Sequence, residues 1–257
     1  MYTMGIDIGS TATKGVIMQD GQEIVISKMV DVGTGTSGVH RVLDAILSDS
    51  GLSLDDMAYI IATGYGRTNF EFANRQMSEL SCHAKGASWR IPEARTIIDI
   101  GGQDAKAIKL DGNGGMVNFV MNEKCAAGTG RFLDVMARVL ETTVDGLGEL
   151  DLRSTEDLSI TSTCTVFAES EVISLLSNGR AVEDIVHAIH ESVAKRACGL
   201  ASRVGVSDPV VMTGGVARNQ GVVRAIEREL KREIIVPDNP QITGALGAAL
   251  LAWEAVK

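Results

Sequence analysis

The chain has 257 residues, of which 45% are hydrophobic and 22% are charged, a balance typical of a globular protein with one or two cores. Its formal net charge of −9 disfavours nonspecific binding to nucleic acid or to an anionic membrane, because both need a basic footprint. We therefore expect an acidic protein whose partners are other proteins and small molecules.

The sequence predicts a cytoplasmic location. No apolar run approaches the roughly 20 residues of a membrane span, and the first residues lack the basic and apolar regions of a signal peptide. In the cytoplasm we expect the four cysteines, Cys82, Cys125, Cys164 and Cys198, to be thiols, metal ligands or core residues rather than disulfides.

The first predicted element is a strand, a glycine turn and a second strand over residues 3–18. Only a turn of glycine and small residues lets the backbone approach a phosphate closely, so this hairpin is a candidate phosphate loop. The residues that we assign to phosphate or its Mg2+ are Asp7, Gly9, Ser10, Thr11, Thr13 and Lys14.

Two helices, over residues 39–50 and 69–89, are predicted on either side of a buried strand that ends at Thr63-Gly64. The first phosphate hairpin and these elements make up a first domain, which we place at residues 1–95.

The second hairpin starts at residue 96 and repeats the first. Asp99 follows Asp7 by 92 positions, and Lys106 follows Lys14 by the same number. A constant offset across a hairpin predicts a duplicated domain. The second set of phosphate candidates is Asp99, Gly101, Gly102 and Gln103.

Three roles follow for these hairpins. Asp7 and Asp99 would face Mg2+ through its waters, because Mg2+ keeps much of its hydration shell. Lys14 would neutralise phosphate charge, and Gln103 and Asp104 would orient the attacking water. The alternative is that each Asp-x-Gly segment is only a tight turn, and the second copy at a constant offset argues against it.

A second repeat shows where the halves differ. The strand before Thr213-Gly214 resembles the strand before Thr63-Gly64, 150 positions earlier, so the second half carries 58 additional residues. Both Cys125 and Cys164 lie in that interval. We therefore predict a second domain over 96–243 with a cysteine-bearing insertion at about 117–180, and a final helix over 244–257 that packs back on the first domain.

Cys125 and Cys164 are candidate metal ligands. They are 39 residues apart, and neither belongs to a Cys-x-x-Cys pair. Each precedes a predicted helix, one over 131–141 and one that starts just after Cys164 and runs through 168–176. Burial as small hydrophobic residues is the alternative for Cys125 and Cys164, and it is the favoured interpretation of Cys82 and Cys198.

The last part of the chain offers an adenosine site. Helices are predicted over 182–204, 217–230 and 243–256, with a strand over 233–236. His187 and His190 are three apart on the first of these helices, but no third metal ligand is evident, so ordinary satisfied histidines are favoured. The residues that would leave room for a flat base are Gly214, Gly215, Val216, Asn219 and Gly244. Close helix packing is the alternative use of these glycines.

Taken as a set, the two hairpins and the glycine turns resemble the actin, hexokinase and Hsp70 ATPase superfamily. Four further segments resemble the activators of 2-hydroxyacyl-CoA dehydratases, a family that also contains the ATPase subunits of benzoyl-CoA reductases. Those segments are 63–67, 78–84, 124–134 and 162–171. The resemblance implies an α/β fold of two duplicated ribonuclease H-like domains with a nucleotide cleft between them.

The same resemblance implies the cofactors and partners. It implies ATP or ADP with Mg2+, and a homodimer that holds one [4Fe-4S] cluster through Cys125 and Cys164 of each subunit. Two thiolates alone cannot close a four-ligand site, whereas a two-fold axis supplies four. ATP hydrolysis would drive one electron, received from ferredoxin or flavodoxin, into a 2-hydroxyacyl-CoA dehydratase.

Three rival functions remain at this point. A sugar or acyl kinase of the same superfamily would carry the cysteines incidentally. A metal-binding scaffold would hold metal without hydrolysing ATP. A zinc protein would use Cys82, Cys125, Cys164 and Cys198 within one chain.

Overall fold

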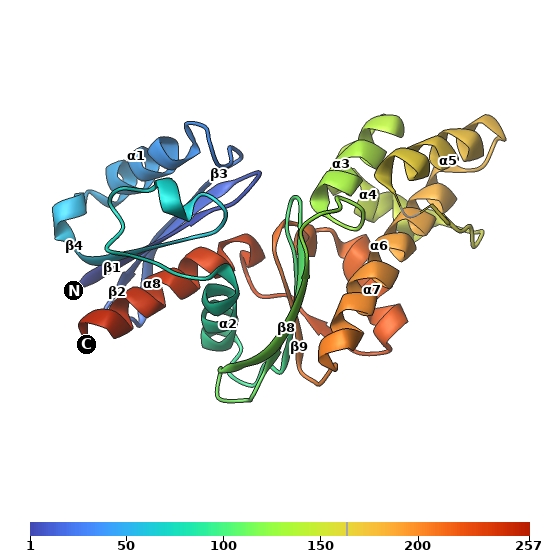
Figure 1. The fold of residues 1–257 in the computed structure, drawn as a ribbon. Coiled ribbons are helices and arrows are strands. Elements are labelled where there is room, and N and C mark those ends of the chain that lie inside the picture. The colour runs from blue at the N-terminus through green and yellow to red at the C-terminus, as the bar shows by residue number, and fades with distance from the viewer. Residues whose placement is uncertain (163) are drawn as a thin grey trace. The chain divides into compact units, whose positions relative to one another are not determined.

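The structure is a computed structural model that describes residues 1–162 and 164–257, so Thr163 of the second cysteine motif lies outside the described residues. The chain forms two compact units. The first comprises Met1–Ala94, Leu110–Val117 and Pro237–Lys257, and the second comprises Arg95–Lys109 and Asn118–Val236. The described residues form two five-stranded sheets, and Figure 1 traces the chain through them.

The first sheet has the order β3-β2-β1-β4-β5, with β1 antiparallel to β2 and parallel to β4. Its strands are β1 (Tyr2–Ile8), β2 (Thr13–Gln19), β3 (Glu23–Val30), β4 (Met57–Thr63) and β5 (Arg75–Gln76). The helices of this unit are α1 (Gly38–Ser50), α2 (Glu79–Arg90) and α8 (Thr243–Val256), with short 3-10 turns η1 (Leu54–Asp56), η2 (Arg67–Asn69) and η5 (Pro240–Ile242).

Strand β1 is buried on both faces, and its polar residues Thr3 and Asp7 are buried together with the apolar ones. Helix α1 buries Val42, Leu43 and Ile46 in the unit's core, and α8 packs against β1, β2, β4 and α2. Gly5 explains how closely α8 approaches, because a Cβ there would lie 2.0 Å from the Ala245 carbonyl oxygen. The C-terminal helix is therefore part of the first unit's core.

The predicted helix over 69–89 is wrong in its first half. Only Glu79–Arg90 is helical, and the residues before it run along the edge of β4. The Asn74 side chain accepts a hydrogen bond from the Ile60 amide at 2.7 Å, and the Met77 amide donates to the Ala62 carbonyl at 2.9 Å. Pairing with a distant strand outweighs the local helical pattern of this segment.

The second sheet has the order β10-β9-β6-β7-β8. Its strands are β6 (Thr96–Ile100), β7 (Ala105–Leu110), β8 (Met116–Asn122), β9 (Val210–Thr213) and β10 (Ile234–Ile235). The helices are α3 (Gly130–Val139), α4 (Val144–Leu150), α5 (Thr165–Ser177), α6 (Val182–Val204) and α7 (Gln220–Leu230), with 3-10 turns η3 (Asp151–Arg153) and η4 (Gly215–Arg218). The helix predicted from 217 begins at Gln220, because Asn219 is its N-cap residue.

The two sheets confirm the predicted duplication and the α/β fold class. If β1 to β5 are matched with β6 to β10 in sequence order, both sheets have the same strand order. The register agrees as well. Asp7 is the cross-strand partner of Lys14, and Asp99 is the partner of Lys106. On the parallel side Asp7 pairs with Thr63, whereas Asp99 pairs with Thr213.

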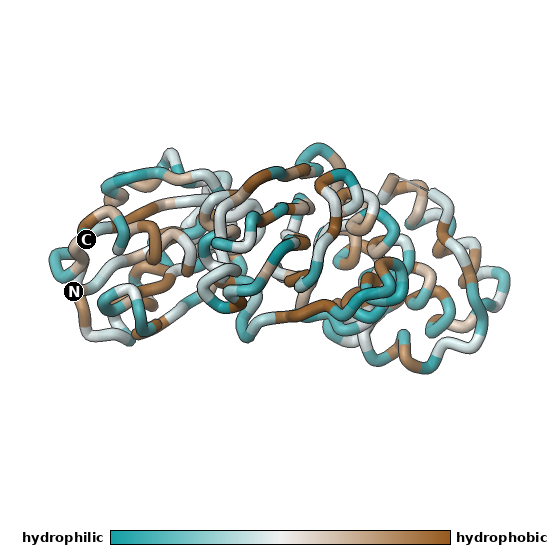
Figure 2. Tube along the Cα trace, turned by 90° about the horizontal axis from the view of Figure 1, so that it is seen from below, coloured by the Kyte–Doolittle hydropathy of each residue, from teal (hydrophilic) through white to brown (hydrophobic). Residues whose placement is uncertain are grey.

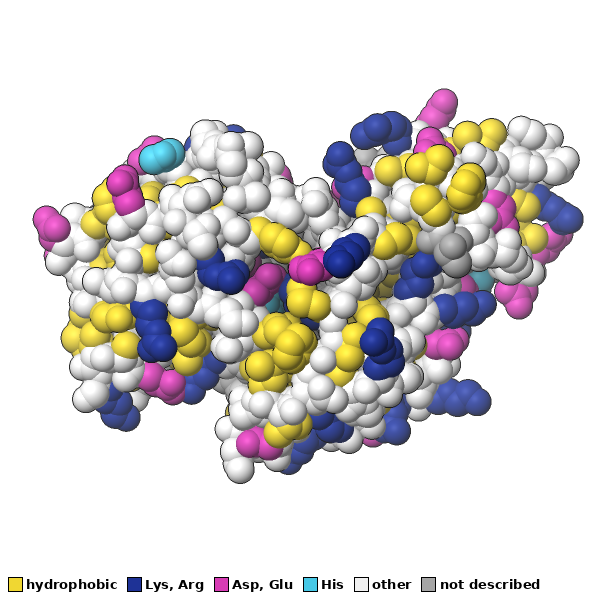
Figure 3. All heavy atoms as spheres, in the orientation of Figure 1, with side chains coloured by type: hydrophobic (Ala, Val, Ile, Leu, Met, Phe, Trp, Pro, Cys, Tyr) yellow, Lys and Arg dark blue, Asp and Glu magenta, His cyan; other side chains and the backbone are white. Residues whose placement is uncertain are grey.

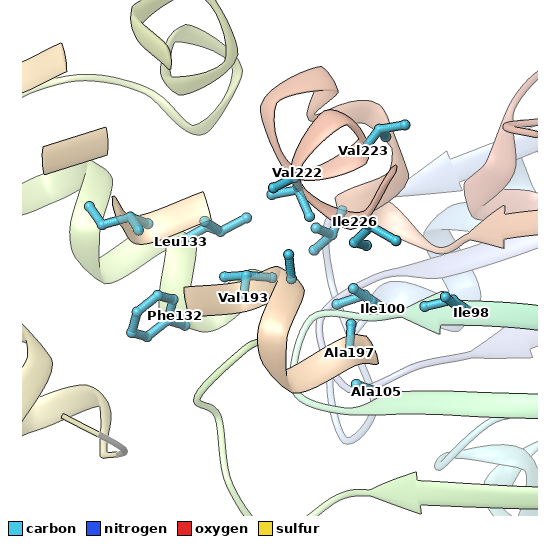
Figure 4. Close-up of a cluster of buried hydrophobic side chains, with 14 of the residues drawn as sticks. Ile98, Ile100, Ala105, Phe132, Leu133, Val193, Ala197, Val222, Val223 and Ile226 are labelled. Atoms are coloured by element: carbon cyan, nitrogen blue, oxygen red, sulfur yellow. The ribbon is translucent and has the colours of Figure 1, made fainter. Parts of the chain in front are cut away.

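Helix α6 runs through the core of the second unit. Its buried residues, such as Ile189 and Val193, meet Phe132 of α3, Ile226 of α7 and Ile98 of β6 (Figure 4). Hydrophobic stretches of the trace alternate with hydrophilic segments at many of the turns (Figure 2). Within the described residues, no helix combines the length and the apolar character that crossing a membrane requires.

Candidate functional site

The first phosphate hairpin joins β1 to β2. Asp7 is buried at the end of β1, and its Oδ2 lies 3.2 Å from the Lys14 Nζ. The Gly9 amide donates to the Ala12 carbonyl at 3.1 Å and closes the turn, which leaves Ser10 and Thr11 at its half-buried tip. The turn therefore presents small residues, with the lysine and the aspartate behind them.

Thr13 has a different environment from the other candidates in this hairpin. It is fully buried, and its hydroxyl donates to the Val32 carbonyl at 2.8 Å. The Thr34 amide in turn donates to the Gly9 carbonyl at 2.9 Å. Thr13 thus helps to hold the loop after β3 against the phosphate turn.

Glycines surround the Asp7 carboxylate. A Cβ on Gly244 would lie 3.2 Å from Asp7 Oδ2, and a Cβ on Gly64 would lie 2.5 Å from Asp7 Oδ1. Gly64 also has a φ of +82°, which favours glycine. The structure therefore brings Gly244 to Asp7. It also shows two neighbours that the sequence did not assign, Gly64 and the buried His83, whose Nε2 would lie 3.0 Å from a Cβ on Gly244.

The second phosphate hairpin has an additional carboxylate. Lys106 Nζ lies 3.2 Å from Asp99 Oδ2 and 2.7 Å from Asp104 Oδ2, and its side chain is 1% exposed. The Thr213 hydroxyl donates to Asp99 Oδ1 at 2.7 Å. A lysine is buried in this way only when it is paired, and here two carboxyl groups share one lysine. Gln103 is exposed at the turn.

The sequence assigned no role to Lys106, although it aligned this residue with Lys14. The usable signal was the aspartate two positions before it, which the first hairpin lacks because Ala12 stands there.

The glycine turn after β9 lies beside the second hairpin. Gly214 has a φ of +86°, and a Cβ there would lie 2.3 Å from the Ile100 carbonyl oxygen and 3.0 Å from Asp99 Oδ1. Gly215 is exposed and Val216 is buried in the η4 turn. The structure therefore brings this turn to Asp99, as a nucleotide site requires.

Asn219 serves helix α7. Its side-chain oxygen accepts hydrogen bonds from the amides of Gly221 and Val222 at 2.9 and 3.2 Å, which is N-cap geometry. Its side-chain amide donates to the Val144 carbonyl at 3.4 Å. These contacts position the helix that follows the glycine turn.

Cys125 and Cys164 are exposed free thiols of the second unit. Cys164 is the N-cap residue of α5, and Cys125 lies in the loop that leads to the start of α3. The donor set fits an iron-sulfur cluster, since thiolates at the N-termini of helices and in a glycine-rich loop suit such a ligand. One chain supplies two of these donors, so four need a second chain.

The other two cysteines are core residues, as predicted. Burial raises the pKa of the Cys82 thiol to about 12, and burial also raises the pKa of Cys198 to about 12. Cys82 packs in the first unit and Cys198 in the core of the second. The one-chain zinc site is therefore wrong.

Helix α3 connects the phosphate turn to the Cys125 segment. The Gly130 amide donates to the Gly101 carbonyl at 2.9 Å, and the Arg131 amide donates to the Gly102 carbonyl at 2.8 Å. The Thr129 hydroxyl lies 2.6 Å from the Ala126 carbonyl oxygen and 3.2 Å from that of Gly102. The residue after Cys125 and the second phosphate loop thus share one hydroxyl group.

The start of α5 exposes apolar side chains next to Cys164. Val166 is 64% exposed and Phe167 is 68% exposed, and Ile173 follows on the same helix. Figure 3 shows hydrophobic side chains gathered over the region of α3 and α5. The exposed apolar side chains make the start of α5 a candidate interaction surface.

His187 and His190 lie beside one shared carboxylate, but within the described residues the buried Nε2 of His190 has no hydrogen-bond partner, so the prediction of satisfied histidines does not hold fully for His190. Asp151 Oδ1 lies 3.0 Å from His187 Nδ1 and 3.2 Å from His190 Nδ1, while Arg224 donates to Oδ2 at 2.8 Å. Burial by itself would raise the pKa of Asp151, but the hydrogen bonds from His190, Arg224 and His187 outweigh it and hold the pKa well below its ordinary value.

Comparisons with known proteins cover the whole chain. The model of the BadF/BadG/BcrA/BcrD ATPase family matches residues 4–252. The activator of lactoyl-CoA dehydratase from Anaerotignum propionicum is 62% identical over 257 residues, which is 100% of this chain and 99% of that protein.

Two solved structures of dehydratase activators are also similar to this chain. The activator of the 2-hydroxyisocaproyl-CoA dehydratase from Clostridium difficile, with bound ADPNP, is 60% identical, covers 99% of this chain and 95% of that chain, and has a TM-score of 0.96. Component A of the (R)-2-hydroxyglutaryl-CoA dehydratase from Acidaminococcus fermentans is 57% identical, covers 100% of both chains and also has a TM-score of 0.96.

Proposed function

Because the chain belongs to the BadF/BadG/BcrA/BcrD ATPase family, we propose that it uses ATP to activate a 2-hydroxyacyl-CoA dehydratase. The relatives named as activators match it over nearly its full length, and one of them binds the ATP analogue ADPNP. They do not favour a sugar or acyl kinase with incidental cysteines. A scaffold without catalysis does not agree with an ATPase family.

Each hairpin offers its own contacts to the nucleotide. In the first, the amides of Gly9, Ser10 and Thr11 and the Lys14 ammonium group suit phosphate oxygens, and Asp7 suits a water of Mg2+. In the second, the matching groups are Gly101, Gly102 and Gln103, with Asp99 toward Mg2+. We assign adenosine to Gly214, Gly215, Val216 and Gly244. The Ile100 carbonyl fills the Cβ position of Gly214, and His83 and Asp7 fill that of Gly244, so these two glycines also serve close packing.

Hydrolysis needs a residue that orients the attacking water. Gln103 is exposed at the tip of the second turn and reaches such a water directly. Asp104 is buried against Lys106, so it acts on the water through the shape and charge of the turn. Both remain the catalytic candidates, with Lys14 as the phosphate cation.

Cys125 and Cys164 of two subunits would hold one [4Fe-4S] cluster, which supplies one-electron transfer when it is bound. A homodimer is favoured because each chain presents two exposed thiols, and because Val166 and Phe167 are apolar and exposed beside one of them. The electron donor would be ferredoxin or flavodoxin, and the compartment would be the cytoplasm.

The observation that carries this function is the hydrogen-bonded link between the second phosphate turn and α3. The Gly101 carbonyl accepts a hydrogen bond from the Gly130 amide and the Gly102 carbonyl accepts one from the Arg131 amide. The Thr129 hydroxyl bridges Gly102 to Ala126. A change of phosphate state moves this turn, and the turn moves the segment that carries Cys125. Local phosphate contacts that bias a larger element are a common switching device.

The test starts with protein purified without oxygen. Native mass spectrometry should find a dimer with four iron and four sulfide in total, and ATP turnover should need no added small hydroxylated substrate. Asp104→Ala should lose ATP turnover and keep the iron. A metal-free monomer, or turnover that requires a sugar or an acyl acid, would contradict the proposal.

A further inference from the structure

Arg196 of α6 contacts both cysteine-bearing segments of the second unit. One of its guanidinium nitrogens donates to the Ser162 carbonyl at 3.1 Å, two residues before Cys164. Its aliphatic chain lies against Gly128, three residues after Cys125, since a Cβ at Gly128 would lie 2.8 Å from Arg196 Cδ. One side chain from the core helix therefore touches two segments that are 34 positions apart.

The Ser162 peptide is held from the other side as well. Its amide donates to Glu171 Oε2 at 3.0 Å, and the Thr161 amide donates to Glu171 Oε1 at 3.0 Å. Glu171 lies on α5, which begins directly after Cys164. The segment before Cys164 is thus fixed between a carboxylate of its own helix and the guanidinium group of α6.

Gly128 is shaped to receive the arginine. Its φ of +82° is costly for a residue with a side chain, and a Cβ would also lie 3.2 Å from the Arg196 Cβ. The glycine therefore meets two needs at once, the turn after Cys125 and the close passage of Arg196.

We propose that Arg196 is a positioning residue that holds the Cys125 and Cys164 segments at a fixed separation and places a permanent positive charge beside the Cys164 segment. The inference deepens the proposed function, since those two thiols are its cluster ligands. Arginine suits the task because its guanidinium group stays charged at all relevant pH values and donates in a fixed plane.

The charge has its own consequence. A positive group near a cluster stabilises the more negative, reduced state, so it raises the reduction potential. Replacing Arg196 by an uncharged residue of similar length should therefore lower the potential, and Arg196→Lys should restore most of it.

The first experiment needs no cluster. Dibromobimane, which becomes fluorescent only when both of its arms have reacted, is added to the apo protein, and peptide mass spectrometry identifies the Cys125–Cys164 cross-link within one chain. Arg196→Met should lower the cross-linking rate several-fold, while the number of thiols alkylated by iodoacetamide stays unchanged. The matched control is Arg203→Met, at an exposed position of the same helix.

Two further variants keep the test decisive if Arg196→Met does not fold. Arg196→Lys should cross-link at a rate between those of the wild type and the methionine variant. Gly128→Ala keeps the charge but displaces the arginine, so it should also slow cross-linking. Equal rates in the wild type, these variants and Arg203→Met would overturn the proposal.

The potential of the loaded protein, measured by redox titration followed by electron paramagnetic resonance, is the second readout. A cluster whose potential and cross-linking are both indifferent to Arg196 would refute the positioning role and leave the proposed function intact. A protein that binds no iron, yet cross-links more slowly without Arg196, would refute the proposed function and leave the positioning role intact.

Discussion

Thr129→Val tests the link between the phosphate turn and the Cys125 segment. The Thr129 hydroxyl lies 2.6 Å from the Ala126 carbonyl oxygen and 3.2 Å from that of Gly102, and valine has the same shape without the hydroxyl. Thr129 is the N-cap residue of α3, but its side chain accepts no helix amide. The substitution therefore removes the bridge without removing a helix cap.

The coupling free energy lost in Thr129→Val can be estimated from the hydrogen bonds that the substitution removes and those that it leaves. The hydroxyl has one proton, so the two contacts together are equivalent to about one hydrogen bond, of about 1 kcal/mol. Both carbonyls keep another partner, since Ala126 still accepts from the Thr129 amide and Gly102 from the Arg131 amide. A loss of about 1 kcal/mol in coupling free energy corresponds to about a five-fold change in a ratio of rates.

The assay is alkylation of Cys125 in protein that lacks the cluster, with either ADP or ADPNP bound. The ratio of the two rates measures the coupling, and in Thr129→Val this ratio should move toward one by up to about five-fold. ATP hydrolysis should stay within about two-fold of the wild type, because the hydroxyl contacts no phosphate candidate side chain. Thr155→Val, at an exposed position of the same unit, is the matched control.

An unchanged ratio in Thr129→Val would show that the hydroxyl carries none of the coupling. In that case the backbone hydrogen bonds of Gly130 and Arg131 would have to carry it alone. A wild-type ratio of one would refute the link as a whole.

Five other variants test the remaining sites. Lys106→Met leaves two buried carboxylates without their cation, so urea unfolding should show that the free energy of unfolding falls by about 3–5 kcal/mol. Lys14→Met should lower it less, because the Lys14 side chain is 16% exposed and faces one carboxylate. Asp151→Asn should lower the free energy of unfolding at pH 7 by about 3 kcal/mol. Since the folded pKa of Asp151 is lowered, this stabilisation is present above the ordinary pKa of about 4, and the gap to the wild type should close as the pH falls below it. Cys125→Ser should lose the iron measured per dimer, whereas Cys82→Ala should retain it; iron loss from the second alone would reverse the assignment.

Local patterns were sufficient to predict the two phosphate hairpins and the strands that end at Thr63 and Thr213. The offset of 92 residues joined Asp7 to Asp99 and Lys14 to Lys106, and these pairs occupy equivalent cross-strand positions in the structure. The aspartate and the lysine of each cross-strand pair lie within one short hairpin, where the alternation of apolar and polar residues and the turn residues determine the strand register.

The errors and omissions came from long-range contacts. The segment before α2 follows a strand edge because Asn74 bonds to Ile60, and no helical pattern contains that information. The roles of Thr129 and Arg196 depend on carbonyls that lie 27 and 34 positions away. A single sequence shows which residue types are present, but the packing of α6 and α3 decides which of them meet.

The two hairpins have diverged in charge since their duplication. Lys14 pairs with Asp7, and the position that corresponds to Asp104 is Ala12, so this charge pair is neutral and part of the lysine is exposed. Lys106 is buried between Asp99 and Asp104, so two carboxyl groups share one lysine in the second hairpin. A neutral turn with a reachable lysine suits a phosphate oxygen, whereas an acidic turn suits a hydrated cation and the attacking water.

The acidic turn is also the one whose carbonyls hold the start of α3. The peptide groups that contact the phosphate would then also hold the start of α3. The Cys125 segment would therefore respond to the loss of the terminal phosphate before any larger movement. Replacing Ala12 by Asp should make the first turn acidic too. The expected result is weaker nucleotide binding by calorimetry with an unchanged Cys125 alkylation ratio, and a changed ratio at unchanged affinity would show that the charge difference between the hairpins does not divide their roles.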